Sequence, residues 1–286
     1  MENSRSGFSQ TNAAALDDET ALPVRTFRVK CFKYGDRGFN GFVSALRALH
    51  EGFWLGFLRA NDLNRITMEH FDQSQYFAST EHNLSGFFEW EKRVVDRYFK
   101  QDSRILVAAA GAGREVLALR KAGFAADGFE CSLHLLRSSS KIFDELGESR
   151  YVIHCPPDRV PPGLPAYDGL VVGWTAYTHI PTRTRRVLFL QDLCRRAPAQ
   201  SPLLISFFTR RSDSPYDRVT RRTANICRVL LRGHEELLEL GDGLSFGRYV
   251  HSFTRDELEA ELRMAGIQLA HYAGEGDWGH AVGITK

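Results

Sequence analysis

Apolar residues recur every three or four positions over the first hundred residues. The segment FNGFVSALRALHEGFWLGFL (39–58) places one such stripe on a helix, and LSGFFEWEKRVVDRYF (84–99) places another. The stripes consist of Phe42, Leu46, Leu49, Phe53 and Phe57 in the first segment and Phe87, Trp90, Val94 and Tyr98 in the second. We interpret residues 26–100 as a helical cap, packed on the next domain, whose aromatic side chains are mainly core and form a lid over a small ligand.

From Arg104 the rhythm changes to short apolar runs that alternate with helical stretches. The predicted strands are ILVAA (105–109), FAADGFE (124–130), YVIH (151–154), GLVVG (169–173) and LLISFF (203–208). The intervening helices cover 115–122, 133–146 and 181–197, the second of them with Ser132 as N-cap and Gly147 just after its end. This alternation is typical of a parallel sheet with helices on both faces.

The carboxyl end of the chain has a different pattern. Thr254 and Glu257 form a capping box that opens a helix, and Gly266 ends it. IQLAHY (267–272) and HAVGIT (280–285) follow, joined by a link that is too short for a parallel crossover. The predicted fold is therefore α/β, a doubly wound, mostly parallel seven-stranded sheet with an antiparallel last strand. The predicted domains are a disordered tail at 1–25, the cap at 26–100 and a ligand-binding domain at 101–286.

A run of small residues follows the first strand, from Val107 to Gly113. Small side chains let the backbone approach a ligand closely, and the N-terminus of the next helix offers free N–H groups. Glu130 ends the second strand, where an acid can bind the hydroxyls of a ribose. Together these features predict a ligand that contains adenosine.

The spacing of the glycines discriminates between two such ligands. Counted from Gly111, a dinucleotide fingerprint would require a small residue where this chain has Val116. Counted from Ala109, the run reads A-x-G-x-G, and with Glu130 and the antiparallel ending it resembles the class I S-adenosylmethionine-dependent methyltransferases of the small-molecule type with an N-terminal helical cap. The resemblance extends from Arg104 to Lys286.

This resemblance implies a set of residues that bind S-adenosylmethionine. Ala109, Gly111 and Gly113 would line its methionine part, Glu130 its ribose, and Asp158 and Arg159 its adenine, while Trp174 would lie near the reacting centre or the adenine edge. The chain departs from the family at three places. Val107 stands where an acid is common, Ala109 replaces the first glycine, and Pro198–Pro202 replaces a P-G-G turn.

The segment GWTAYTHIP (173–181) follows the fourth strand, at the edge where ligands bind in such sheets. Tyr177 and His179 are the candidate catalytic residues and, with the weaker candidate Tyr76, the candidate acceptor-binding residues. His179 has an ordinary pKa near neutrality and is a candidate general base. The competing interpretation is that His179 only precedes the helix that starts at Pro181.

Arginines are dense between Arg183 and Arg232. Arg218, Arg221, Arg222, Arg228 and Arg232 fall within about one third of the helical wheel, opposite Val219, Ile226 and Leu230. One hypothesis is therefore an RNA or protein methyltransferase that uses this basic face. The favoured interpretation is a solvated face balanced by the acidic stretch from Glu235 to Glu261, and the net charge of +2 argues against a nucleic-acid partner.

Composition narrows the remaining choices. The five cysteines include no C-x-x-C pair, so we predict neither a disulfide framework nor a metal site. No apolar run could span a bilayer, and the polar N-terminus is unlike a signal peptide, which predicts a cytoplasmic protein. The leading hypothesis is methyl transfer from S-adenosylmethionine to an oxygen or nitrogen of a small molecule. A nicotinamide-dependent oxidoreductase and a non-catalytic methyltransferase-like subunit are the other hypotheses, and the oligomeric state is left open.

Overall fold

The computed structural model describes residues 27–232 and 236–286. They divide into two compact units, one that ends at Leu46 and one from Arg47 to Lys286. Helix α1 (Phe27–Phe57) contains the boundary between them. The predicted tail at 1–25 lies outside the described residues, and the domain boundary near residue 100 stays a prediction. Among the helices described, none combines the length and apolarity needed to cross a membrane.

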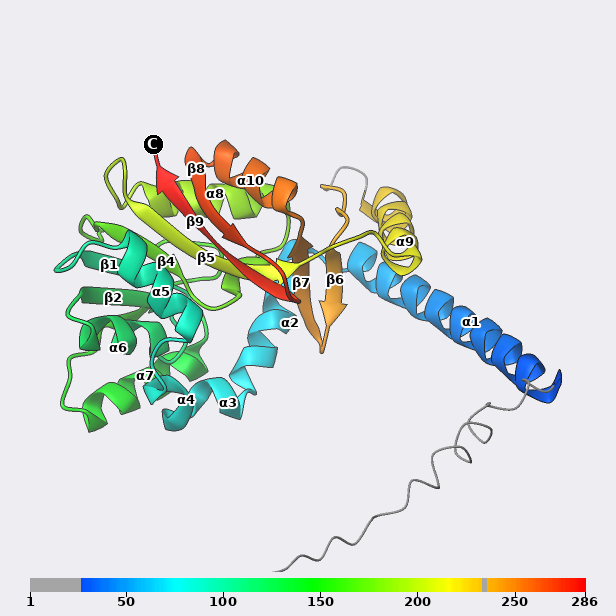
Figure 1. Ribbon diagram of the computed structural model, residues 1–286, viewed down its shortest axis with the longest axis horizontal. Coiled ribbons are helices and arrows are strands. Elements are labelled where there is room, and N and C mark those ends of the chain that lie inside the picture. The colour runs from blue at the N-terminus through cyan, green and yellow to red at the C-terminus, as the bar shows by residue number, and fades with distance from the viewer. Residues whose placement is uncertain (1–26, 233–235) are drawn as a thin grey trace, which may run out of the picture. The chain divides into compact units, whose positions relative to one another are not determined.

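A nine-stranded sheet forms the centre of the second unit, with the order β3-β2-β1-β4-β5-β7-β6 and with β9 and β8 continuing from β5 (Figure 1). Pairing along β3-β2-β1-β4-β5 is parallel, and β9 runs antiparallel to both β5 and β8. The strands are β1 (Arg104–Ala108), β2 (Ala125–Glu130), β3 (Val152–His154), β4 (Gly169–Val172), β5 (Pro202–Thr209), β6 (Asp242–Ser245), β7 (Arg248–Phe253), β8 (Ile267–Ala273) and β9 (Trp278–Thr285). The doubly wound, mostly parallel α/β prediction is confirmed.

The predicted count of seven strands is wrong by two. The β6–β7 hairpin was not predicted, and β7 adds to the sheet by pairing with the end of β5, Ser252 opposite Phe208. β6 then pairs antiparallel with β7 at the edge of the sheet.

Helices cover both faces of the parallel strands because these strands are apolar on both sides. On β1, Leu106 and Ala108 pack into one buried cluster with residues of α8 and α10, whereas Ile105 and Val107 pack into another with residues of α5, α6 and α7. The helices after α1 are α2 (Ala60–Asp72), α3 (Gln75–Ala78), α4 (Thr80–Leu84), α5 (Glu89–Tyr98), α6 (Arg114–Lys121), α7 (Leu133–Glu145), the short 3₁₀ helix η1 (Ala176–His179), α8 (Arg183–Cys194), α9 (Pro215–Arg232) and α10 (Arg255–Met264).

Capping residues and glycines in the sequence correctly predicted several helix ends. The Ser132 hydroxyl accepts the Leu135 N–H at the start of α7, at 3.1 Å. Thr254 and Glu257 form the predicted capping box of α10. Gly147 and Gly266 follow the ends of their helices with φ values of 68° and 80°, which glycine adopts without steric cost.

The predicted cap is helical. However, α1 does not bury the apolar stripe from which a helix was predicted there. In the second unit, α1 buries Ala48, Gly52, Leu55 and Gly56, while the aromatic side chain of Phe53 is 43% exposed. The stripe of α5 behaves as predicted, since Val94 is buried and Phe87 and Trp90 pack against the same cluster.

On α9, Arg218, Arg221 and Arg222 are exposed, as the favoured interpretation of a solvated face expects, but the helix does not divide into a basic face and a buried apolar face. The helix buries Thr220, Ala224 and Arg228, while Ile226 and Leu230 are exposed. The buried face of α9 contains small residues because α1 packs very close to this helix. A Cβ atom on Gly52 would lie 2.6 Å from the Thr220 carbonyl oxygen, and one on Gly56 would lie 2.5 Å from that of Ala224. On α8, Arg186 is completely buried as well, so the arginines from 183 to 232 do not form one exposed surface.

Candidate functional site

The loop between β1 and α6 takes an unusual backbone path. Ala109, Gly111 and Gly113 have φ values of 52°, 58° and 103°, so three of five successive residues are left-handed. The loop also comes close to the end of β4, where the Gly173 N–H donates to the Ala108 carbonyl at 2.8 Å. A Cβ atom on Gly173 would lie 2.2 Å from the Ala109 carbonyl oxygen. A glycine at 173 is therefore part of what shapes the loop, and the sequence analysis did not identify it.

Glu130, at the end of β2, holds this loop through its carboxylate. One oxygen accepts the Gly111 N–H at 2.8 Å. The other accepts the N–H groups of Cys131 and Ser132 at 2.8 and 2.7 Å. A carboxylate oxygen has two acceptor sites, so the oxygen bound to Gly111 can accept a further hydrogen bond from a ligand.

The loop and Glu130 line one cavity together with residues of α2, α4 and the segments after β3 and β4. About 1120 Å³ in it is not occupied by protein atoms, its open mouth included. Of the predicted residues, the cavity is lined by Ala109, Gly111, Glu130, Asp158, Arg159, Trp174 and His179. Residues separated by up to 70 positions in the sequence are thus brought to one site.

Asp158 lines the cavity and connects the segment after β3 to α2 and α8. Its carboxylate accepts from Asn64 of α2 at 2.5 Å and from Arg185 of α8 at 3.2 Å. Burial raises the pKa of this carboxyl, and the hydrogen bonds from Asn64 and Arg185 oppose that rise. The side chain is therefore fixed in place at the cavity wall.

Trp174 lines the cavity next to two aromatic side chains. Its ring centroid is 5.2 Å from that of Phe88 and 6.4 Å from that of Phe77. Its backbone N–H donates to the Glu115 carboxylate at 3.1 Å. Its indole Nε1 is buried and has no hydrogen-bond partner among the described residues, so a donor is left for a ligand.

A buried ion cluster beside the cavity was missed by the sequence analysis. Arg114, at the start of α6, donates to Glu91 of α5 at 2.6 and 2.7 Å and to Glu115 at 2.7 Å. It also stacks over the Phe88 ring, 4.2 Å from the centroid. These three charges sum to −1, and both Arg114 and Glu115 line the cavity. Because the partners lie 23 residues apart, no local spacing reveals the pair.

Histidines line the cavity in neutral form. His179 is buried, and its Nδ1 lies 2.8 Å from the Tyr249 carbonyl, which requires the hydrogen on Nδ1 and leaves the lone pair on Nε2. Burial lowers the pKa of His179 to about 4. His82, another residue that was not predicted, also lines the cavity, and burial, followed by the Arg114 charge, lowers its pKa.

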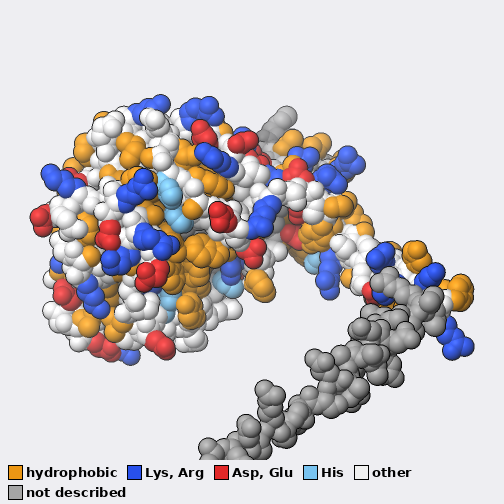
Figure 2. Space-filling model, in the orientation of Figure 1, with side chains coloured by type: hydrophobic (Ala, Val, Ile, Leu, Met, Phe, Trp, Pro, Cys, Tyr) orange, Lys and Arg blue, Asp and Glu red, His pale blue; other side chains and the backbone are white. Residues whose placement is uncertain are grey.

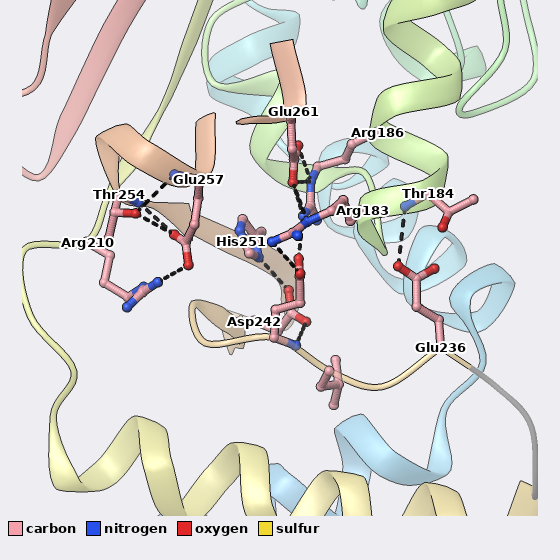
Figure 3. Close-up of polar contacts among 12 residues, drawn as sticks. Arg183, Thr184, Arg186, Arg210, Glu236, Asp242, His251, Thr254, Glu257 and Glu261 are labelled. Carbon is pink, nitrogen blue, oxygen red and sulfur yellow. Dashed lines mark hydrogen bonds and ion pairs between the residues drawn. The ribbon is translucent and has the colours of Figure 1, made fainter. Parts of the chain in front are cut away.

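Three predicted residues lie elsewhere. Tyr177 is fully buried, does not line the cavity and donates to Glu261 at 2.7 Å. Figure 3 shows Glu261 beside Arg186. Tyr76 is 57% exposed, does not line the cavity and contacts the His82 ring, with 4.4 Å between the ring centroids. Gly113 does not line the cavity because it packs against Phe143, 2.8 Å from where a Cβ atom would be.

Glu239, His251 and Glu261 form a cluster whose donor atoms are close enough to hold a metal. Donor atoms of Glu239, His251 and Glu261 all lie within 4.8 Å of one another. However, Arg186 donates to Glu239 at 2.9 Å and to Glu261 at 2.6 Å, and Arg183 lies 2.6 Å from Glu239. The guanidinium groups supply the positive charge at this cluster, which joins α8, α10 and the segment before β6.

Comparison with known proteins places the fold. No protein-family model and no curated sequence matches the chain. Among solved structures, the chain is similar to the 1,6-didemethyltoxoflavin-N1-methyltransferase of Burkholderia thailandensis, determined with bound 1,6-didemethyltoxoflavin and S-adenosylhomocysteine (TM-score 0.56, 13% identity, 80% of this chain and 91% of that one).

Two further structures have comparable scores. One is a S-adenosylmethionine-dependent methyltransferase of Methanosarcina mazei (TM-score 0.52, 15% identity, 70% of this chain and 98% of that one). The other is an amino pentose methyltransferase of Micromonospora echinaspora with bound S-adenosylmethionine (TM-score 0.52, 14% identity, 74% and 98%). With the strand order above, these similarities show that the chain has the class I methyltransferase fold.

Proposed function

We propose that this protein is an enzyme that transfers a methyl group from S-adenosylmethionine to an oxygen or nitrogen of a small, uncharged acceptor. The observation that carries the proposal is the set of carboxylates around the β1–α6 loop. Glu130 accepts a hydrogen bond from the Gly111 N–H, and Glu115 lies in the first turn of α6 on the cavity wall.

These carboxylates discriminate between the two candidate ligands that contain adenosine, a dinucleotide and S-adenosylmethionine. A dinucleotide places its anionic pyrophosphate at the N-terminus of the first helix, where it needs free N–H groups. Here the Gly111 N–H, in the loop before this helix, is occupied by Glu130. The carboxylates of Glu130 and Glu115 line the same cavity, together with Arg114, which is paired with Glu115 and Glu91. A cationic sulfonium is favoured there by the same charges.

The cavity residues fit S-adenosylmethionine in their donor and acceptor chemistry. Glu130 has acceptor sites left for ribose hydroxyls, Asp158 and Arg159 line the wall beyond it, and Ala109 and Gly111 allow close approach of the backbone. When bound, S-adenosylmethionine supplies an already activated methyl group. The protein then mainly has to position the acceptor and exclude water.

The chemistry of the remaining wall supports a small acceptor with an apolar, planar part. Phe71, Phe77 and Trp174 surround this space, and its histidines are neutral at physiological pH. His179 presents an Nε2 lone pair, which can accept a proton or a hydrogen bond from the acceptor. Phe71 and Phe208 hold the imidazole ring between them at centroid distances of 5.3 and 6.2 Å.

Calorimetric titration with S-adenosylhomocysteine and with NAD tests the cofactor. We expect the former to bind and the latter not to bind. Glu130→Gln should weaken binding at least tenfold, about 1.4 kcal/mol, because it removes a charged acceptor. The exposed Glu259→Gln is the matched control. Binding of NAD with no binding of S-adenosylhomocysteine would overturn the proposal.

A screen of small molecules with methyl-labelled cofactor, read by mass spectrometry, tests the transfer. Once an acceptor is found, His179→Gln should lower kcat about 100-fold or more without changing the affinity for S-adenosylhomocysteine. The wild-type rate should stay level from pH 8 down to pH 5 and fall near pH 4. A fall near pH 6.5 instead would contradict the role of His179.

A further inference from the structure

His82 lines the same cavity as His179 but comes from a different element, α4. Its backbone N–H donates to the Ser79 hydroxyl that caps this helix, at 3.2 Å. The side-chain amide of the next residue, Asn83, donates to the backbone carbonyls of Phe77 and Ser79 at 2.9 and 2.8 Å. The backbone that carries the His82 imidazole is therefore held in place before any ligand binds.

The imidazole of His82 has hydrogen-bonding groups that the protein does not use. Neither ring nitrogen has a hydrogen-bond partner among the described residues, and neither is fully enclosed by protein, although the residue is only 9% exposed. Burial, followed by the Arg114 charge, lowers the pKa of His82. The ring is therefore neutral at physiological pH and offers one N–H and one lone pair to a ligand in the cavity.

His179 differs from His82 because only one of its ring nitrogens is unused. Its Nδ1 donates to the Tyr249 carbonyl at 2.8 Å, so the neutral ring can only accept at Nε2. A ligand group at His179 must therefore be a donor, an O–H or an N–H. A group at His82 can be either a donor or an acceptor, and a hydroxyl satisfies both cases.

Two phenylalanines connect these histidines along the cavity wall. Phe71 of α2 contacts the His179 ring at a centroid distance of 5.3 Å, and Phe77 of α3 contacts the His82 ring at 5.6 Å. Phe71 and Phe77 contact each other at 5.5 Å, and all four residues line the cavity. Figure 2 shows a similar mixture on the visible face of the second unit, where histidine side chains lie among hydrophobic ones. The wall is thus apolar in its middle and polar at its two ends.

The charges beside His82 disfavour an anionic group at that end of the wall. Arg114 and Glu115 line the cavity, and Arg114 donates to both Glu91 and Glu115, at 2.6 and 2.7 Å. The guanidinium is therefore already paired, and the cluster has a net charge of −1, which repels an anion. A neutral polar group such as a hydroxyl fits this end of the wall.

We propose that the methyl acceptor is a planar aromatic molecule with a neutral polar group at each of two opposite ends. His179 Nε2 binds an O–H or N–H at one end, and His82 binds the polar group at the other. This inference rests on the proposed methyl transfer, because it describes the acceptor of that reaction. An acceptor with a single polar end would leave the ring nitrogens of His82 without a partner once water is displaced from the cavity, which lowers its affinity.

Calorimetric titration of the complex with S-adenosylhomocysteine tests the acceptor with three pairs of compounds of increasing length. The pairs are hydroquinone and phenol, 2,6-dihydroxynaphthalene and 2-naphthol, and 4,4′-dihydroxybiphenyl and 4-phenylphenol, and the members of each pair differ only in the second hydroxyl. We expect at least one diol to bind about fivefold or more tightly than the other member of its pair. Equal affinities within all three pairs, or no binding of any of the compounds, would overturn the inference.

Two substitutions at His82 distinguish hydrogen bonding from packing. His82→Phe keeps an aromatic ring but has no polar atom, so it should bind both members of the pair equally. His82→Gln keeps a donor and an acceptor and should retain the preference for the diol. Glu81→Gln, at an exposed position of the same helix, is the matched control and should behave as the wild type. A preference for the diol that persists in His82→Phe would contradict the role of His82.

The same titrations separate the identity of the acceptor from the proposed function. If S-adenosylhomocysteine binds but no diol is preferred, the inference about the acceptor is wrong and methyl transfer still stands. If S-adenosylhomocysteine does not bind, both are wrong. Unchanged affinity for S-adenosylhomocysteine in the variants at positions 81 and 82 confirms that each is folded.

Discussion

Ala109 has a left-handed backbone conformation, with φ of 52°, at the first turn of the β1–α6 loop. An L-residue with a Cβ atom pays about 1–2 kcal/mol for this conformation, and glycine avoids that cost. The carbonyl of the same residue contacts Gly173, so the loop is held on both sides.

We expect Ala109→Gly to stabilise the protein by about 1 kcal/mol, because relief of the strain outweighs the larger entropy of glycine in the unfolded chain. Urea unfolding measures this directly. The same substitution at Ala118, inside α6, should destabilise by about 1 kcal/mol. If the two variants changed stability in the same direction, the strain assigned to Ala109 would be wrong.

Gly173→Ala, unlike Ala109→Gly, should destabilise the protein and disturb the β1–α6 loop. Its Cβ atom would lie 2.2 Å from the Ala109 carbonyl oxygen, and backbone cannot move aside as a side chain can. We expect a loss of about 1–3 kcal/mol in stability together with weaker binding of S-adenosylhomocysteine, measured by unfolding and calorimetry. Gly276→Ala, whose Cβ atom would lie 3.7 Å from its nearest neighbour, the Trp278 carbonyl oxygen, should change neither.

The site residues that could be predicted are those whose signal is local. Ala109, Gly111 and Glu130 stand at fixed distances after strands, so a sequence pattern finds them. Gly173 and His82 depend on contacts with residues far along the chain, and no spacing encodes these. Tyr177 was predicted in the site because it stands two residues before His179 on η1, but its side chain points to Glu261 and does not line the cavity.

Among the elements, α5 and α6 depend on each other through the Arg114 guanidinium. Arg114→Met would leave the carboxylates of Glu91 and Glu115 buried without their cation, which costs about 3–5 kcal/mol. Unfolding by urea, followed by fluorescence, would measure the loss. Arg150→Met, in the exposed pair with Asp144, should leave stability nearly unchanged. Equal effects of the two substitutions would show that the buried cluster is not needed for folding.

Elements were predictable where apolar residues mark the buried face. This held for β1 to β5 and for α5, α7 and α10. It failed for α9, because the face against α1 is made of small residues and the apolar side chains point outward. It failed for β6 and β7 because Gly241, Gly243 and Gly247 interrupt the segment and obscure its alternation.

At the scale of the whole molecule, buried neutral histidines make stability depend on pH. The folded pKa of His179 is about 4, well below its ordinary value of 6.5, because burial disfavours the charged form. Between these values the unfolded chain binds the proton and the folded protein does not. Stability therefore falls as the pH falls from 6.5 to 4.

For His179 this loss amounts to about 3 kcal/mol, and His280, also near 4, adds to it. The raised pKa values of Glu91 and Glu239 act in the opposite direction. Urea unfolding of the wild type and of His179→Gln at pH 4.5, 5.5 and 6.5 isolates the contribution of His179. We expect a shallower pH dependence in that variant, whereas the exposed His154→Gln should match the wild type. Equal slopes in all three proteins would refute the assignment.

The three hydrogen bonds that Glu130 accepts from Gly111, Cys131 and Ser132 also bear on kinetics. They give the loop its binding shape before a ligand arrives, so association need not wait for the loop to order. The Gly111 amide should then exchange slowly with deuterium in the ligand-free protein, and added S-adenosylhomocysteine should slow it only slightly further. Encounter with the cofactor would be limited by diffusion and by access through the cavity mouth, not by a rearrangement of the first strand's loop.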